Sequence, residues 1–169
     1  SKAALLGISE GGSMCALFAA TYPERASALV MSGCYPKWIR AADYPWAPTR
    51  EDHEAAFLAY ERNWGTPIGF KIVAPSVAND EQCRNWWARN LRLGASPTSG
   101  IALYRMNIEI DIRNVLSAIH VPTLLLHREG DRLINVENSR YMATRIPGAK
   151  YVELKGVDHL PWFGDSETV

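Results

Sequence analysis

The stretch LLGISEGGS, residues 5–13, places a serine between glycines directly after an apolar run. Gly7, Ser9 and Gly11 match the pattern G-x-S-x-G, in which a strand turns sharply into a helix and lifts the serine above the sheet. Gly7 and Gly11 suit this turn because strand and helix backbones approach so closely that a Cβ atom would clash. Three fixed positions of common residue types also recur by chance, and Ser9 could instead be a helix N-cap. The stretch therefore indicates a candidate nucleophile, whose partners must be sought further along the chain.

Four short apolar runs indicate the strands of a parallel sheet. They are nearly continuous in apolar residues, which is typical of strands covered on both faces. The runs are KAALLGI (2–8), ASALVMSG (26–33), VPTLLLH (121–127) and AKYVELKG (149–156). Helical patterns follow the first and third runs, at about 12–21 and 136–145. This alternation of strands and helices predicts an α/β fold with a mostly parallel sheet and right-handed crossovers.

A long middle segment, residues 35–118, differs from the rest because it lacks strand patterning. We interpret it as a helical insertion between two parts of the core, residues 1–34 and 119–169. Its predicted helices are 50–64, 79–93 and 96–107. It holds five of the six tryptophans, namely Trp38, Trp46, Trp64, Trp86 and Trp87. These rings could line an apolar pocket, but packing between the helices is the favoured interpretation, with Trp86 and Trp87 pointing different ways.

A histidine and a carboxylate follow the candidate serine in the order that a serine hydrolase uses. A serine hydroxyl is a poor nucleophile near neutral pH unless a base takes its proton. Asp131 lies in LLLHREGDR (124–132) and His159 in LKGVDHLPW (154–162), each just after a predicted strand. The carboxyl ends of parallel strands meet at one edge of the sheet. We therefore expect Ser9, Asp131 and His159 to lie together.

Each of these residues also has a simpler interpretation. Asp131 could be a turn aspartate beside Gly130, and His159 could cap a final helix or be solvated. Asp158 and Glu129 are competing candidates for the acid, although the Gly-Asp pair after the strand favours Asp131. Three other histidines are not expected to be catalytic: His53, His120 and His127.

Two segments carry a resemblance to a known family. GISEGGSMCALFAATYPERASALVMSG (7–33) and VPTLLLHREGDRLINVENSRYMATRIPGAKYVELKGVDHLPWFGD (121–165) resemble the α/β-hydrolase superfamily. Within it they are similar to the hydrolase domains fused to adenylate or guanylate cyclases in bacteria. The resemblance covers almost every residue outside the insertion. It implies the C-terminal half of an α/β-hydrolase fold, with about four strands and a helical cap.

The resemblance also implies roles for individual residues. Ser9 corresponds to the nucleophile, Asp131 to the acid and His159 to the base. The backbone amide of Glu10 corresponds to one donor of the oxyanion hole, and residues 35–118 correspond to the cap over the site. No metal ion or organic cofactor is implied.

In that family the early strands and the second oxyanion donor precede the nucleophile strand, so they would lie upstream of Ser1. We therefore expect this chain to be a fragment cut at both ends. Losing one oxyanion donor costs about 3 to 4 kcal/mol of transition-state stabilisation, so the chain alone is expected to be weakly active or inactive. Its first strand, residues 1–8, would expose an apolar edge that favours aggregation.

The expected function is hydrolysis of carboxylic esters or related acyl compounds through an acyl-enzyme. Serine at the turn argues against the dehalogenases and epoxide hydrolases that resemble this fold, because these use a carboxylate nucleophile. Amidase, aminopeptidase, thioesterase and carbon–carbon hydrolase activities stay open. The alternative is a ligand-sensing module that regulates a fused output domain such as a nucleotide cyclase, and a third possibility is an interaction domain with a degenerate site. A complete triad favours the enzyme.

The composition limits the class of partner. Eighteen Lys and Arg balance eighteen Asp and Glu, so no strong positive field exists to hold nucleic acid. No apolar run reaches the ~20 residues of a membrane span. Three widely spaced cysteines suit reduced thiols rather than disulfides or a zinc site. We expect a cytoplasmic protein acting on a small acyl substrate, with a dimer left open.

Overall fold

Four parallel strands form one sheet in the computed structural model, which describes residues 1–164. The strands are β1 (Ala3–Ile8), β2 (Ala26–Ser32), β3 (Thr123–Arg128) and β4 (Lys150–Leu154), and they lie in the order β1-β2-β3-β4. Every neighbouring pair is parallel. The predicted α/β class with about four parallel strands is confirmed. The last five residues of the predicted segment 119–169 lie outside the described residues.

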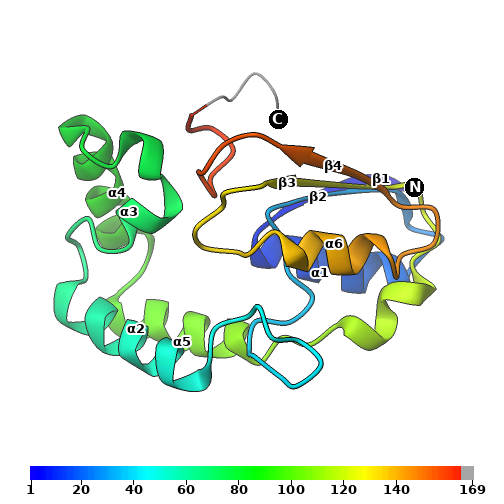
Figure 1. Ribbon diagram of the computed structural model, residues 1–169, viewed down its shortest axis with the longest axis horizontal. Helices are drawn as coiled ribbons and strands as arrows, with labels where there is room; N and C mark the ends of the chain where they lie inside the picture. Colours follow the sequence, from blue (N-terminus) through cyan, green and yellow to red (C-terminus); the bar gives the residue numbers. More distant parts are fainter. Residues whose placement is uncertain (165–169) are drawn as a thin grey trace.

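The main core lies between the sheet and helices on one of its faces (Figure 1). These helices are α1 (Glu10–Thr21), α6 (Glu137–Ala143) and the 3-10 helix η2 (Arg113–Ala118). Small side chains let α1 approach the strands closely, because Ala16 and Ala19 are fully buried against the sheet. Leu29 and Met31 of β2 and Leu125 of β3 fill the same cluster.

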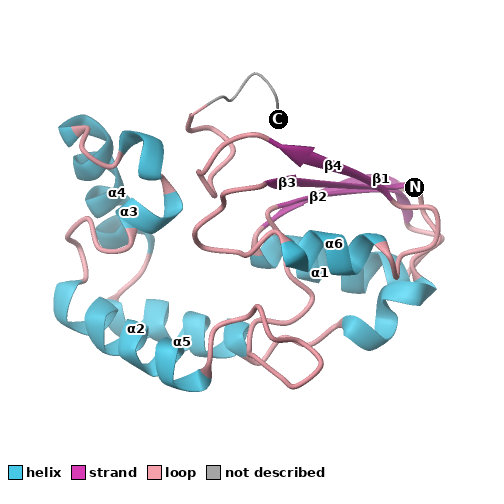
Figure 2. Cartoon of the chain, in the orientation of Figure 1, coloured by secondary structure: helices cyan, strands magenta, loops and turns pink. Residues whose placement is uncertain are grey.

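The opposite face of the sheet is not covered by any helix within residues 1–164 (Figure 2). Successive side chains of a strand point to opposite faces, so every second apolar residue lies on this side. Leu6 of β1 is 67% exposed and Val152 of β4 is 42% exposed. Leu6 pairs with Val30, and Val30 with Leu124, so the apolar row continues across the sheet. The expectation that all four strands are covered on both faces is therefore wrong for the described chain.

The insertion between β2 and β3 folds into helices that lie beside the sheet (Figures 1 and 2). These insertion helices are α2 (Arg50–Asn63), α3 (Phe70–Val73), α4 (Glu81–Gly94) and α5 (Pro97–Ile108), with a 3-10 turn η1 (Pro75–Val77). The longest, α2 and α4, have 14 residues each. No helix within residues 1–164 is long and apolar enough to cross a membrane.

Side-chain caps explain where the three longer insertion helices begin, which is within two residues of the predicted starts at 50, 79 and 96. Thr49 and Asp52 form a capping box at the start of α2. The Asp80 side chain accepts a hydrogen bond from the amide of Cys83 at α4, and the Ser96 side chain accepts one from the amide of Ser99 at α5. Such caps satisfy amides that have no partner inside the helix.

Candidate functional site

Ser9 occupies a strained turn between β1 and α1. Its backbone has φ 55° and ψ −129°, and it is the only non-glycine residue with positive φ among those described. A backbone of this kind costs about 1 to 3 kcal/mol and persists only where surrounding structure imposes it. Its amide donates a hydrogen bond to the carbonyl of Ser32 (3.1 Å). Ser9 stands at the N-cap position, but its side chain makes no capping hydrogen bond, so the hydroxyl is not used by the helix.

The turn has no room for a Cβ atom at Gly7 and Gly12, whereas the sequence predicts Gly7 and Gly11. A Cβ atom on Gly7 would lie 2.5 Å from the amide nitrogen of Gly12 and 2.6 Å from the carbonyl oxygen of Gly11. This confirms the close approach expected at Gly7. A Cβ atom on Gly11 would meet nothing within 4 Å, whereas one on Gly12 would lie 2.7 Å from Cβ of Cys34. The clash expected at Gly11 is therefore wrong, because it is Gly12 that faces the loop after β2.

Asp131 and His159 form a buried pair in the loops that follow β3 and β4. Oδ2 of Asp131 lies 2.7 Å from Nδ1 of His159, and both side chains are 2% exposed. Oδ1 of Asp131 accepts hydrogen bonds from the amides of Leu133 (2.9 Å) and Ile134 (3.0 Å). Asp131 is therefore both a turn aspartate and a partner of His159. Oδ1 accepts the hydrogen bonds that close the turn, and Oδ2 accepts the one from the histidine.

The ionised carboxylate of Asp131 determines which ring nitrogen of His159 donates to it. Burial by itself raises the pKa of Asp131, but interactions with His127 and His159 outweigh it and hold that pKa well below its ordinary value. An ionised carboxylate only accepts hydrogen bonds, so Nδ1 of His159 is the donor. In the neutral imidazole Nε2 then carries a lone pair. This buried Nε2 atom has no hydrogen-bond partner within residues 1–164, and it can therefore accept a proton.

The loop after β2 connects the serine turn to the histidine pair. Ser32 accepts the hydrogen bond from the amide of Ser9. At Gly33, the next residue, a Cβ atom would lie 3.2 Å from Nδ1 of His159 and 3.4 Å from Oδ2 of Asp131. The loops that carry Ser9, Asp131 and His159 are thus at the same edge of the sheet, as parallel strands require.

The competing candidates for the acid are engaged elsewhere. Oδ1 of Asp158 accepts a hydrogen bond from the amide of Ser76 (2.9 Å). Glu129 forms an exposed ion pair with Lys155 (2.9 Å). Among the described contacts, neither carboxylate reaches His159, so the geometry favours Asp131.

Two of the remaining histidines lie away from this pair. His53 is buried on α2, where its Nε2 atom lies 2.6 Å from the carbonyl oxygen of Trp38. His120 is exposed in the connection before β3. Neither has a described contact with Ser9, Asp131 or His159.

His127 lies against the pair, and the sequence interpretation missed this. Its side chain is fully buried on β3, and its Nε2 atom lies 3.4 Å from Oδ2 of Asp131. The sequence contains a signal for the burial, because Thr123, Leu125 and His127 alternate along one strand and share the covered face. The contact itself depends on the turn after β3, which strand patterning does not describe.

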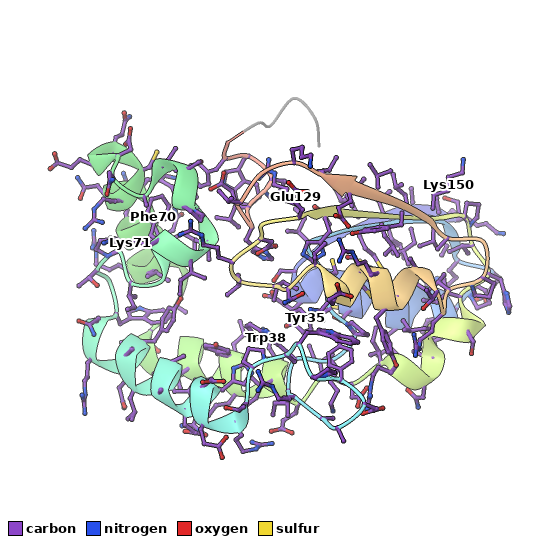
Figure 3. The ribbon with its side chains drawn as sticks, viewed as in Figure 1. Tyr35, Trp38, Phe70, Lys71, Glu129 and Lys150 are labelled. Carbon is purple, nitrogen blue, oxygen red and sulfur yellow. The ribbon has the colours of Figure 1, made fainter. Side chains whose placement is uncertain are left out.

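An apolar cleft of about 230 Å³ lies beside Ser9, and most of its lining residues belong to the insertion helices. Tyr35 and Trp38 lie between the sheet region and these helices (Figure 3), with ring centroids 4.8 Å apart. Besides Ser9 and Glu10, the cleft is lined by Trp38, Tyr60, Trp64, Val73, Trp87, Leu91, Gly100, Ile101, Leu103, Tyr104, Asn107 and Leu133. Three of the five insertion tryptophans thus contribute to the cleft.

The backbone amide of Glu10 directly follows Ser9 in the chain. Glu10 is the first residue of α1, and the first amides of a helix have no acceptor inside that helix. The helix dipole adds positive potential at the same end.

Among residues 1–164 no cluster of three or more His, Cys, Asp or Glu side chains is arranged to hold a metal ion.

Comparisons with known proteins identify the family of this fold. The family model described as alpha/beta hydrolase fold matches residues 1–165. A pimeloyl-[acyl-carrier protein] methyl ester esterase of Nitrosomonas europaea is 24% identical over 165 residues, which are 95% of this chain and 66% of that protein. A Petunia hybrida karrikin insensitive 2 receptor is 26% identical over 141 residues, 82% of this chain and 51% of the receptor.

A solved esterase of Exiguobacterium antarcticum has a TM-score of 0.87 at 24% identity, over 98% of this chain and 62% of its own. The chain thus spans between about half and two thirds of the length of these proteins. Since the family model matches nearly the whole sequence, the chain belongs to the α/β-hydrolase family.

Proposed function

We propose that this chain carries the catalytic site of a serine hydrolase for carboxylic esters or related acyl compounds. Ser9 is the nucleophile, His159 the general base and Asp131 the acid that orients the base. The observation that carries the proposal is the buried Asp131–His159 pair with its 2.7 Å contact, at the sheet edge where Ser9 stands in a strained turn. The esterase named among the relatives supports the same chemistry.

The reaction follows from the protonation states of the pair. Nε2 of His159 takes the proton of Ser9 while Oγ attacks the carbonyl carbon, and it then gives this proton to the departing alcohol. Water attacks the resulting acyl-enzyme with His159 again as base, which releases the acid and restores Ser9. Asp131 keeps Nδ1 protonated and stabilises the imidazolium that forms in each step.

The oxyanion of each tetrahedral intermediate needs hydrogen-bond donors. The amide of Glu10 is one donor, since it lies at the N-terminus of α1 next to the nucleophile. Such donors act at a point where charge develops, and removing one costs about a hundredfold to a thousandfold in kcat.

The cleft indicates the acyl class. Its lining is mostly aromatic and aliphatic, which favours an apolar acyl group. Asn107 is the polar exception, because it is only 7% exposed and lines the same cleft. We propose a substrate with an apolar chain that carries one hydrogen-bonding group. Each buried methylene should raise kcat/KM about fourfold until the cleft is filled, at about 0.8 kcal/mol per methylene.

The test is pre-steady-state hydrolysis of a nitrophenyl ester by the protein at the full length that its gene encodes. We expect a burst of nitrophenol equal to the concentration of protein, because acylation of Ser9 precedes release of the acid. Ser9→Ala should abolish the burst and lower kcat by about 10⁴-fold or more. Mass spectrometry of the wild-type protein after a fluorophosphonate should find the added group on Ser9.

Ser117→Ala is the matched control, because Ser117 is an exposed serine on η2. It should keep the full burst. Equal slow hydrolysis by the wild type and Ser9→Ala, with no burst in either, would contradict the proposal.

Ligand sensing is the second candidate function. One relative is named as a receptor, which supports a cleft that binds a ligand and reports its presence, and a fused output domain such as a nucleotide cyclase stays a prediction. The two functions differ in the role of the nucleophile. A sensor that only binds keeps its ligand response in Ser9→Ala, whereas a hydrolase loses turnover in that variant.

A further inference from the structure

We propose that His127 is a positioning residue that acts on His159 through Asp131. Its N–H group lies beside Oδ2 of Asp131 and weakens the attraction of this carboxylate for the proton on Nδ1 of His159. This inference rests on the proposed function for its catalytic meaning. The coupling of the three side chains can be measured without turnover.

The contacts of His127 fix its tautomer. Nε2 lies 2.9 Å from the carbonyl oxygen of Ile134 and 3.4 Å from Oδ2 of Asp131. Both oxygens only accept hydrogen bonds, so Nε2 must carry a proton. The neutral ring then accepts at Nδ1, where Oγ of Ser139 lies at 2.7 Å and donates. Ser139 of α6 thereby holds the His127 N–H toward Ile134 and Asp131.

The contact with Asp131 acts on its charge more than on its orientation. The amides of Leu133 and Ile134 already hold Oδ1, so the carboxylate keeps its plane without His127. Oδ2 lies between two imidazoles, at 2.7 Å from His159 and 3.4 Å from His127. The longer distance is an electrostatic contact rather than a hydrogen bond of ordinary length. Positive charge on that N–H draws electron density from Oδ2 and weakens its pull on His159.

Few other charged groups reach this centre. From β3, the Arg128 guanidinium donates to the carbonyls of Asp158 (3.2 Å) and Leu160 (3.1 Å), on the loop that carries His159. From that loop, the Asp158 carboxylate bonds the amide of Ser76. From the β3 turn, Glu129 faces Lys155. From α6, only the neutral Ser139 contacts His127 among the described residues.

The test compares His127→Gln with His127→Leu. Gln can place an N–H where Nε2 stands, whereas Leu removes it and keeps an apolar side chain. ¹⁵N NMR titration of His159 should give a higher pKa in the Leu variant than in the wild type, and a value near wild type in the Gln variant. The acid limb of kcat/KM should move the same way, so kcat/KM near pH 6 falls about threefold to tenfold. The alkaline plateau and KM should change less than twofold.

Several outcomes would overturn the inference. One is an unchanged or lowered His159 titration in a folded Leu variant, and another is equal loss in the Leu and Gln variants at every pH. If the Leu variant does not fold, the ¹⁵N shifts of His127 in the wild type show which of its ring nitrogens is protonated, and this tests the inference. Protonation at Nε2 supports the inference, and protonation at Nδ1 contradicts it. A shifted His159 titration without any ester hydrolysis would overturn the proposed function alone.

Discussion

At the scale of single residues, the site depends on one carboxylate that serves two structures at once. Asp131 closes the turn after β3 with Oδ1 and holds His159 with Oδ2. Interactions with His127 and His159 overcome the effect of burial and depress the pKa of Asp131. A depressed pKa in the folded state means that the ionised carboxylate stabilises the fold.

This stabilisation predicts a particular response to acid. It is fully present above the unfolded-state pKa of about 3.9 and is lost as the pH falls toward the lower folded-state value. Below about pH 4, the wild type should therefore lose free energy of unfolding more steeply than Asp131→Asn, which has no carboxylate to protonate at this site. Urea unfolding at several pH values between 3 and 4.5 measures the two slopes.

Glu129→Gln provides the control, because this exposed carboxylate stands two residues before Asp131 and pairs with Lys155. Its acid slope should match that of the wild type. Identical slopes for the wild type and Asp131→Asn would show that Asp131 does not stabilise the fold as an anion.

At the scale of elements, the sequence can indicate a candidate site residue when that residue directly follows a predicted strand. Ser9, Asp131 and His159 could each be selected as candidates because each follows an apolar run. The sequence indicates that Gly12 extends the tolerance of the turn for close approach, but its contact with Cys34 could not be predicted because Cys34 lies in another loop. The helix α3 has only four residues, which is too short for a 3.6-residue period to be visible.

Two neighbouring tryptophans on helix α4 allow a matched test of the cleft lining. Trp86 and Trp87 are neighbours on this helix, with ring centroids 6.4 Å apart. Trp87 lines the cleft, whereas Trp86 is 43% exposed and does not. Trp87→Ala should lower kcat/KM for an octanoyl ester by about tenfold or more, given about 1.5 to 3 kcal/mol for burial of a large apolar side chain. An acetyl ester should be affected much less.

The ratio of octanoyl to acetyl kcat/KM is the quantity to measure. Trp87 also donates a hydrogen bond to the carbonyl of Ile68 (2.7 Å), so its loss can disturb the fold and slow both esters alike. The ratio separates the two effects. Trp86→Ala should leave the ratio unchanged, and an equal change in both variants would contradict the assignment of Trp87 to the cleft.

At the scale of the whole molecule, the described chain has a sheet with helices on one face only. Its other face presents Leu6 and Val152, 67% and 42% exposed. Apolar patches of this kind favour association. The 169-residue chain should therefore self-associate as its concentration rises, and Leu6→Lys should lower the average mass measured by light scattering, because a charged side chain resists burial.

Leu93→Lys is the comparison variant, since Leu93 is 74% exposed on α4, away from the sheet. Its average mass should follow that of the wild type. A lower mass for Leu93→Lys, with no change for Leu6→Lys, would assign association to the insertion helices instead.

The insertion also has a consequence for the order in which the chain folds. Strands β2 and β3 are neighbours in the sheet, yet residues 33–122 separate them in sequence. Closing so long a connection costs chain entropy before the strands can pair, and contacts of this kind slow folding. The serine turn requires only β1, α1 and β2, which leave the ribosome before the insertion and β3. A growing chain therefore carries Ser9 long before His127, Asp131 and His159 have been synthesised, so the proposed nucleophile has no proposed base until the insertion, β3 and β4 have been made.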